Sequence, residues 1–117
     1  MCDIQEGSLL KQDYSEVTSL NKALKLVKKG KLFPILLLPA EFGGEDVAVN
    51  RTYVPAGIPE VKDQITGTLI QFAAEGLIDR LRVKVKYKGK SVVPSKIKMV
   101  CTHTEKEGRI EPEIEIW

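Results

Sequence analysis

The sequence predicts an α+β domain of two layers, with a mainly antiparallel five-stranded sheet and two helices on one of its faces. Apolar residues recur at helical spacing in two segments, residues 14–29 and 59–75, and alternate with polar residues in several others. Single helices and runs of strands follow one another in the order α-β-β-α-β-β-β, which is typical of α+β domains. The length of 117 residues fits one domain.

The first helix is expected to follow an irregular lead-in of residues 1–12, and the single α+β domain to span residues 13–117. Asp13 and Glu16 have the spacing of a capping box, in which two side chains satisfy free amides at a helix start. Apolar positions then recur every three or four residues, and Gly30 is a natural stop. These signals predict a helix over about residues 14–29.

A β-hairpin is predicted next, from a strand at 32–38 and a returning strand at 47–54, joined by turn residues around Gly43 and Gly44. The first strand contains an unbroken apolar run, so both of its sides need cover. A homodimer interface is one hypothesis for this cover, and the segment 8–10 is the other. The run consists of Ile35, Leu36, Leu37 and Leu38.

The second helix is predicted over about residues 59–75, because a proline suits its first turn and a glycine follows its last. Period-two alternation predicts three further strands, separated by turn residues at Gly89 and at 105–108. These strands cover residues 79–88, 91–104 and 109–117.

The most specific chemical pattern lies in the first of these strands, where basic and apolar residues alternate from Arg80 to Lys90. Such a strand has one face on the core and one in water, and its wet face carries cations and no acid. Residues 80–98 hold eight bases and no acid. The residues predicted to bind a partner are Arg82, Lys84, Lys86, Lys88, Lys96 and Lys98.

Strand order decides whether the acidic last strand neutralises this basic stripe. A hairpin turn across 105–108 places Lys98 opposite Glu115, whereas a tighter turn places it opposite Trp117. In a simple meander, the strand that begins at Arg80 has a basic strand as its neighbour and stays only partly neutralised. If it pairs directly with Glu111, Glu113 and Glu115, the charges cancel. Both arrangements are open at this point.

The charge pattern predicts a small, non-catalytic binding or regulatory protein, such as an inhibitor or immunity-type module. This protein would dock an acidic protein partner. Nucleic-acid binding by the same strand is the first alternative, although the net charge is only +2 and stacking aromatics are missing. The second alternative is a small enzyme with a site near Arg51 and His103, with Glu41 as a further candidate. Arg51 is a candidate anion clamp, unless it pairs with Glu41 or Glu60.

The sequence holds no phosphate-cradling glycine motif and no set of metal ligands, so neither a cofactor nor a metal is predicted. Cys101 and His103 share the inward strand face and are expected to be packing residues. Two cysteines do not indicate a disulfide framework. No apolar run reaches membrane-spanning length and the first residues do not resemble a signal peptide, so we expect no membrane association and a cytoplasmic location.

Overall fold

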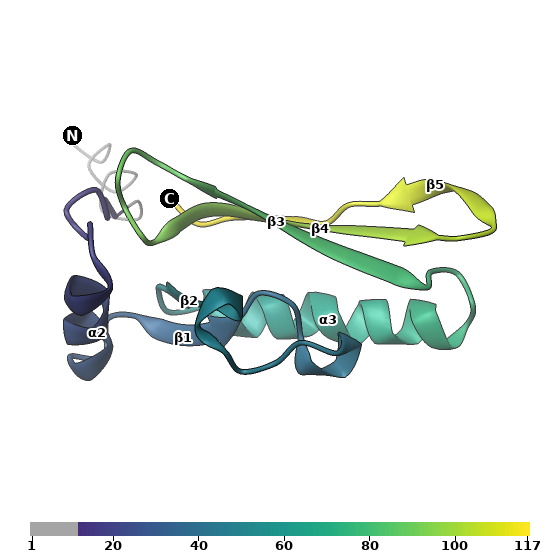
Figure 1. The fold of residues 1–117 in the computed structure, drawn as a ribbon, viewed down its shortest axis with the longest axis horizontal. Helices are drawn as coiled ribbons and strands as arrows, with labels where there is room; N and C mark the ends of the chain where they lie inside the picture. The colour runs from purple at the N-terminus through teal and green to yellow at the C-terminus, as the bar shows by residue number, and fades with distance from the viewer. Residues whose placement is uncertain (1–11) are drawn as a thin grey trace, which may run out of the picture.

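A computed structural model describes residues 12–117, so all but the last residue of the predicted lead-in lies outside it. The fold has two layers (Figure 1): a four-stranded antiparallel sheet, and beneath it a helix with a two-stranded sheet. The α+β class and the antiparallel pairing are confirmed. The single five-stranded sheet was wrong, because the first hairpin forms a separate two-stranded sheet.

The elements follow the predicted sequence, except that the last predicted strand is divided in two. The helices are α2 (Leu20–Lys28) and α3 (Ile58–Ala74), with short 3-10 helices at Ala40–Phe42 and Ala48–Asn50. The strands are β1 (Phe33–Leu36), β2 (Arg51–Val54), β3 (Arg80–Tyr87), β4 (Pro94–His103), β5 (Lys106–Ile110) and β6 (Glu113–Glu115).

Strand β4 is central to the larger sheet, with β3 on one side and both β5 and β6 on the other. The predicted strand 109–117 is interrupted at Pro112, which has no amide hydrogen to donate, although its carbonyl still accepts from Met99 at 2.9 Å. The hairpin turn lies at Thr104 and Glu105, rather than across 105–108. The β-meander of β3, β4 and β5–β6 is therefore the arrangement that the chain adopts.

The first hairpin is shorter than predicted because one side chain replaces part of the strand ladder. The Asn50 amide accepts from the Leu38 backbone N–H at 2.8 Å and donates to the Leu38 carbonyl at 3.0 Å. It also donates to the Glu45 carbonyl at 3.0 Å, which holds the connecting loop against the strand. Residues 48–50 consequently form a 3-10 turn, and strand β2 begins only at Arg51.

Helix α2 begins at Leu20 and not near residue 14, because the predicted capping box does not form. The Asp13 carboxylate accepts from the backbone N–H of Ser15 at 2.8 Å, which is a local turn. The helix is instead capped by Ser19, whose hydroxyl accepts from the Lys22 amide at 3.2 Å.

The segment ahead of α2 is held by the loop before β4. The Tyr14 carbonyl accepts from the Ser91 hydroxyl at 2.7 Å, and the Val17 carbonyl from the Val92 amide at 2.8 Å. These long-range hydrogen bonds hold the backbone of this segment in a non-helical conformation. Helix α2 stands at one end of the two layers while α3 covers the sheet face (Figure 1), so the prediction that both helices share one face was wrong.

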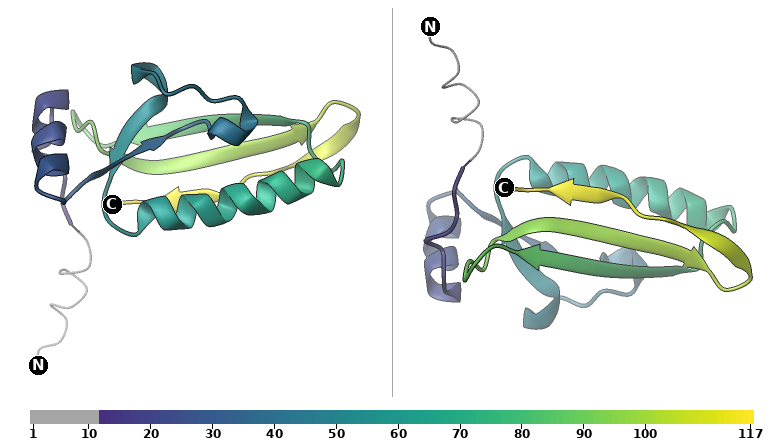
Figure 2. Two further views of the ribbon diagram at one scale, coloured as in Figure 1. Left: turned by 90° about the horizontal axis from the view of Figure 1, so that it is seen from below. Right: turned by 90° about the horizontal axis from the view of Figure 1, so that it is seen from above.

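The core has two parts. The larger part lies between the inner face of the four-stranded sheet and the layer formed by α3 and the first hairpin, and the smaller part joins α2 to the segment just before β4. Figure 2 shows the course of these elements from below and from above. Fully buried residues of the larger part include Leu69, Ile97, Met99 and Cys101. The smaller part consists of Tyr14, Val17, Ala23, Leu32 and Val93, with Trp117 packed against it.

Replacing Leu69 by alanine tests the placement of the larger core. Leu69 is 1% exposed, so Leu69→Ala leaves a cavity and should lower the free energy of unfolding by about 2–5 kcal/mol. Leu20→Ala is the matched control, because Leu20 is also helical but 53% exposed. Urea unfolding of both variants measures the difference, and equal midpoints for the two would contradict this core.

Candidate functional site

The outer face of the four-stranded sheet carries the predicted basic residues, and the alternation along β3 is confirmed. Its even-numbered residues are exposed, whereas Leu81, Val83 and Val85 are half-buried and pack against the core. In the β3–β4 register, Lys84 lies opposite Lys98 and Lys86 opposite Lys96. Cations of neighbouring strands therefore stand side by side, which is mildly unfavourable.

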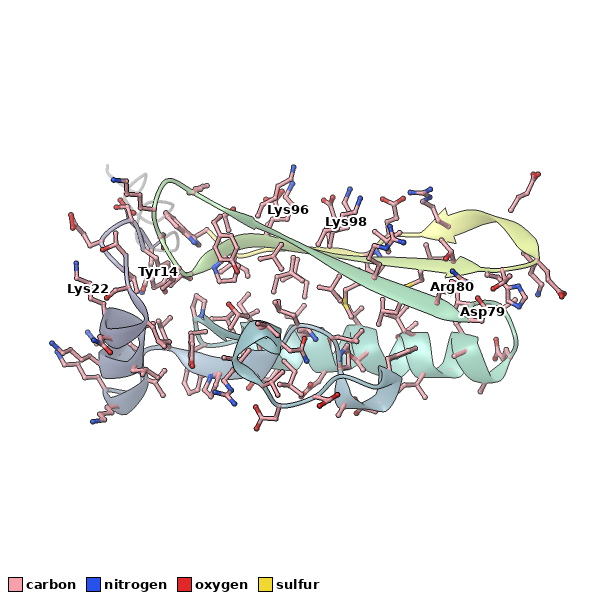
Figure 3. The ribbon with its side chains drawn as sticks, viewed as in Figure 1. Tyr14, Lys22, Asp79, Arg80, Lys96 and Lys98 are labelled. Atoms are coloured by element: carbon pink, nitrogen blue, oxygen red, sulfur yellow. The ribbon has the colours of Figure 1, made fainter. Side chains whose placement is uncertain are left out.

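The two β4 lysines are neutralised from the other side by carboxylates around β6. Lys96 Nζ lies 3.7 Å from a carboxylate oxygen of Glu113 and 3.6 Å from one of Glu115. Lys98 Nζ lies 3.2 Å from Glu113 and 3.4 Å from Glu111. Both lysines point away from the helical layer (Figure 3).

These contacts shift the pKa values of the groups that make them. Hydrogen bonding to Lys98, supported by the charges of Lys96 and Lys98, lowers the pKa of the Glu113 carboxyl. Hydrogen bonds to Glu113 and Glu111 raise the pKa of the Lys98 ammonium. Each charged form thus favours the other, and the ion pairs persist at neutral pH.

The register that creates these ion pairs differs from both predicted registers. Lys98 lies opposite Glu113 and Lys96 opposite Glu115, rather than Lys98 opposite Glu115 or Trp117. The cause is a bulge in β5: His103 pairs with Lys106 and Cys101 with Ile110, so β5 advances four positions while β4 advances two.

A glycine makes this bulge feasible. Gly108 lies inside it with φ +90°, a backbone conformation that other residues rarely adopt. The turn and the bulge together move the acidic residues along β4. The prediction that the last strand would bring acids against the β4 lysines still agrees with the structure.

Strand β3 carries four cations. Arg80 directly follows Asp79 and interacts with its charge, and we call the other three, Arg82, Lys84 and Lys86, the β3 stripe. Within residues 12–117, none of the three has a carboxylate oxygen within 4.0 Å, since the ion pairs of the sheet's outer face involve β4 and the β5–β6 segment. The acidic strand is two strand spacings away, about 10 Å. That distance exceeds the Debye length of about 8 Å at physiological salt, so neutralisation from there is weak.

Lys88, the fourth predicted binding residue of this segment, lies beyond the end of β3. Its ammonium lies 5.0 Å from the ring centre of Trp117, within range of a cation–π interaction. Trp117 also meets Tyr14 edge to face, with 5.8 Å between the ring centres. Lys88 therefore belongs to the contacts that close the smaller core, apart from the β3 stripe.

Arg51 already has a carboxylate partner. Its Nε and Nη2 lie 3.0 and 2.8 Å from the same oxygen of Asp46, and this hydrogen bonding raises the pKa of the guanidinium. The predicted partners Glu41 and Glu60 were wrong, because the 3-10 turn before β2 brings Asp46 alongside. A carboxylate here competes with any external anion for Arg51.

The residues of the enzyme alternative are not brought together. Arg51 lines a groove of about 440 Å³ between α2 and the first hairpin, Glu41 a cavity of about 320 Å³ beside α3, and His103 one of about 210 Å³ near the β4–β5 turn. The His103 ring accepts a hydrogen bond from the Glu105 amide at 3.0 Å, and its other nitrogen lies 3.9 Å from Asp79. These contacts fix His103 at the end of the sheet.

The remaining predictions concern Cys101 and the apolar run 35–38. Cys101 is fully buried, and burial raises the pKa of its thiol, as expected of a packing residue. Ile35 and Leu37 pack against the larger core, and Ile35 and Leu36 line the 440 Å³ groove between α2 and the first hairpin. Homodimerisation through the run 35–38 stays a prediction, and the alternative cover at 8–10 lies outside the described residues.

A buried lysine was missed at the sequence level. Lys62 is 4% exposed, lines the same 320 Å³ cavity as Glu41, and burial lowers the pKa of its ammonium. A signal was present, because Lys62 stands three residues before Ile65 and seven before Leu69, on the apolar side of the helix. Because lysine is charged, this position was not counted as part of the apolar face.

A carboxylate substitution tests the ion pairs between β4 and β6. The lowered pKa of Glu113 means that its stabilising effect is present at neutral pH and is lost as the pH falls through that pKa. Glu113→Gln should therefore have a lower unfolding midpoint than the wild type at pH 7, and the difference should be smaller at about pH 3. Urea unfolding at the two pH values measures the difference.

Glu107→Gln is the matched control, because Glu107 lies on β5 and has no ion pair within 4.0 Å among the described residues. Its midpoint should stay close to that of the wild type at both pH values. A loss in Glu113→Gln that is equally large at pH 7 and at about pH 3 would contradict the ion-pair assignment.

Comparison with known proteins adds no family to this geometry. No family model matches the chain, and no similar protein was found among curated proteins or solved structures. Within residues 12–117, no three histidine, cysteine, aspartate or glutamate side chains gather as metal ligands, and no helix is long and apolar enough to cross a membrane. The candidate site is therefore identified from charge and strand geometry alone.

Proposed function

We propose that this domain is a binding or regulatory module that docks an acidic protein partner through the β3 stripe, in the manner of an inhibitor or immunity-type protein. The observation that carries the proposal is the unequal neutralisation of the basic face. Lys96 and Lys98 have carboxylates within 4.0 Å, whereas the three cations of the β3 stripe have none among residues 12–117. An acidic partner supplies the missing charges.

A protein partner fits the face better than a nucleic acid does. The outward positions of β3 and β4 carry no aromatic side chain for base stacking, because Tyr87 has the inward parity and lines a cavity with Tyr53. The acidic row around β6 lies along the same face and repels a phosphate backbone that tracks across it. A protein partner can present its acids opposite the stripe alone, so that no negative charge lies beside the acidic row.

The exposed setting of the stripe suits recognition more than tight anchoring. Exposed charges at an interface mainly speed association and exclude wrong partners, while each contact adds little to affinity. Lys96 and Lys98 contribute to the proposed surface only by their position beside the stripe, on its β4 side. Their own charges are already matched by carboxylates.

The proposal predicts selective binding of acidic polypeptides. Fluorescence anisotropy with labelled polyglutamate, and with DNA and RNA oligonucleotides of equal charge, should show tighter binding of polyglutamate. In the triple variant Arg82→Gln, Lys84→Gln, Lys86→Gln that binding should weaken about tenfold or more, because three unpaired cations are removed.

The matched control removes three charges elsewhere, from Lys22, Lys25 and Lys29, in and directly after helix α2. This variant should keep most of the binding. Equal losses in the two triple variants would mean that net charge and not the β3 stripe governs binding. Tighter binding of the oligonucleotides, lost in the β3 variant, would instead make the stripe a nucleic-acid surface and overturn the proposal.

A further inference from the structure

Strand β3 is an edge strand whose outer side is unpaired within the described chain. It pairs with β4 alone in the order of the larger sheet, and both views of Figure 2 show it at the edge of that sheet. It is eight residues long, without a proline. Edge strands of this length are places where an extended segment of another chain can add to a sheet.

The hydrogen-bond pattern of β4 shows which groups of β3 face this open edge. Met99 N–H donates to the Pro112 carbonyl at 2.9 Å, and the Ser95 carbonyl accepts from the Ile116 amide at 2.8 Å. Odd-numbered residues of β4 thus direct their backbone groups to the β6 side, and even-numbered ones to β3.

It follows from the register that even-numbered residues of β3 bond to β4, since Lys98 lies opposite Lys84 and Val100 opposite Arg82. The N–H and C=O groups of Leu81, Val83 and Val85 therefore point to the open edge. Their side chains lie on the inner face. The edge offers a row of backbone donors and acceptors flanked on its outer face by cations.

The cations determine which strand can occupy this edge. A second copy of β3 in antiparallel pairing would place one row of cations beside another, which is unfavourable. A strand with acids on its outer face would neutralise the stripe, as the acids around β6 neutralise Lys96 and Lys98. The charges thus guard the edge against self-association and favour an acidic occupant.

We propose that the acidic partner adds an extended segment, antiparallel, to the open edge of β3. This inference rests on the proposed function and specifies the partner's chemistry. The segment has acidic residues alternating with apolar ones, so that the acids flank Arg82, Lys84 and Lys86 while the apolar residues extend the inner face. Residues 113–116 of this chain, Glu-Ile-Glu-Ile, are an internal example of the same pattern beside β4.

Antiparallel addition makes a specific prediction about the partner's backbone. Directly paired residues that exchange hydrogen bonds have side chains on the same face. The partner amides that bond to Leu81, Val83 and Val85 are therefore those of its apolar residues, while the amides of its acidic residues point away. Blocking one set should abolish pairing, and blocking the other should leave it intact.

The test uses three labelled peptides of about ten residues in which glutamate alternates with valine, a length that matches β3. One peptide is unmodified, one carries N-methyl groups on the valine amides, and one carries them on the glutamate amides, with equal charge and equal numbers of methyl groups. Anisotropy against the wild type should show that valine methylation weakens binding about tenfold or more, whereas glutamate methylation has little effect.

Other results separate failure of this inference from failure of the proposed function. Equal binding of all three peptides, with binding still lost in the Arg82→Gln, Lys84→Gln, Lys86→Gln variant, would overturn strand addition and leave acidic docking intact. Loss on glutamate methylation alone would overturn the antiparallel arrangement. If neither the unmodified peptide nor polyglutamate bound in a stripe-dependent way, both would fall.

Discussion

The structure depends on the pairing of β4 with a strand on each side. Its inner face supplies three fully buried residues, Ile97, Met99 and Cys101, to the larger core. Because side chains alternate, the same register that buries these residues fixes Lys96 and Lys98 on the outer face. A slip by one residue would bury two lysines, so packing of the core also determines the charge layout of the surface.

The charge layout is unequal because the acidic residues are placed on one side only. Three carboxylates around β6 surround the two lysines of β4, and β4 then separates them from the β3 stripe. The stripe consequently meets cations on one side and an open edge on the other. The acidic docking and the resistance to self-association that we propose both follow from this one arrangement.

Features with a local cause could be predicted from the sequence. The alternation of β3 and the apolar spacing of α3 record which faces are buried, and both elements agree with prediction within about two residues. Features with a distant cause could not. The Asn50 amide ends a strand by bonding to Leu38, and the contacts of Tyr14 with Ser91 prevent an early helix start. The β6 register depended on a bulge, which no periodicity reveals.

Amide hydrogen exchange along β3 tests the central claim most directly, since it reports the register and the open edge together. The amides of Arg82, Lys84 and Lys86 should be protected, because they face β4, and those of Leu81, Val83 and Val85 should exchange fast. Protection of both sets would mean that the edge is already covered. The reverse alternation would contradict the register, and with it the β3 stripe.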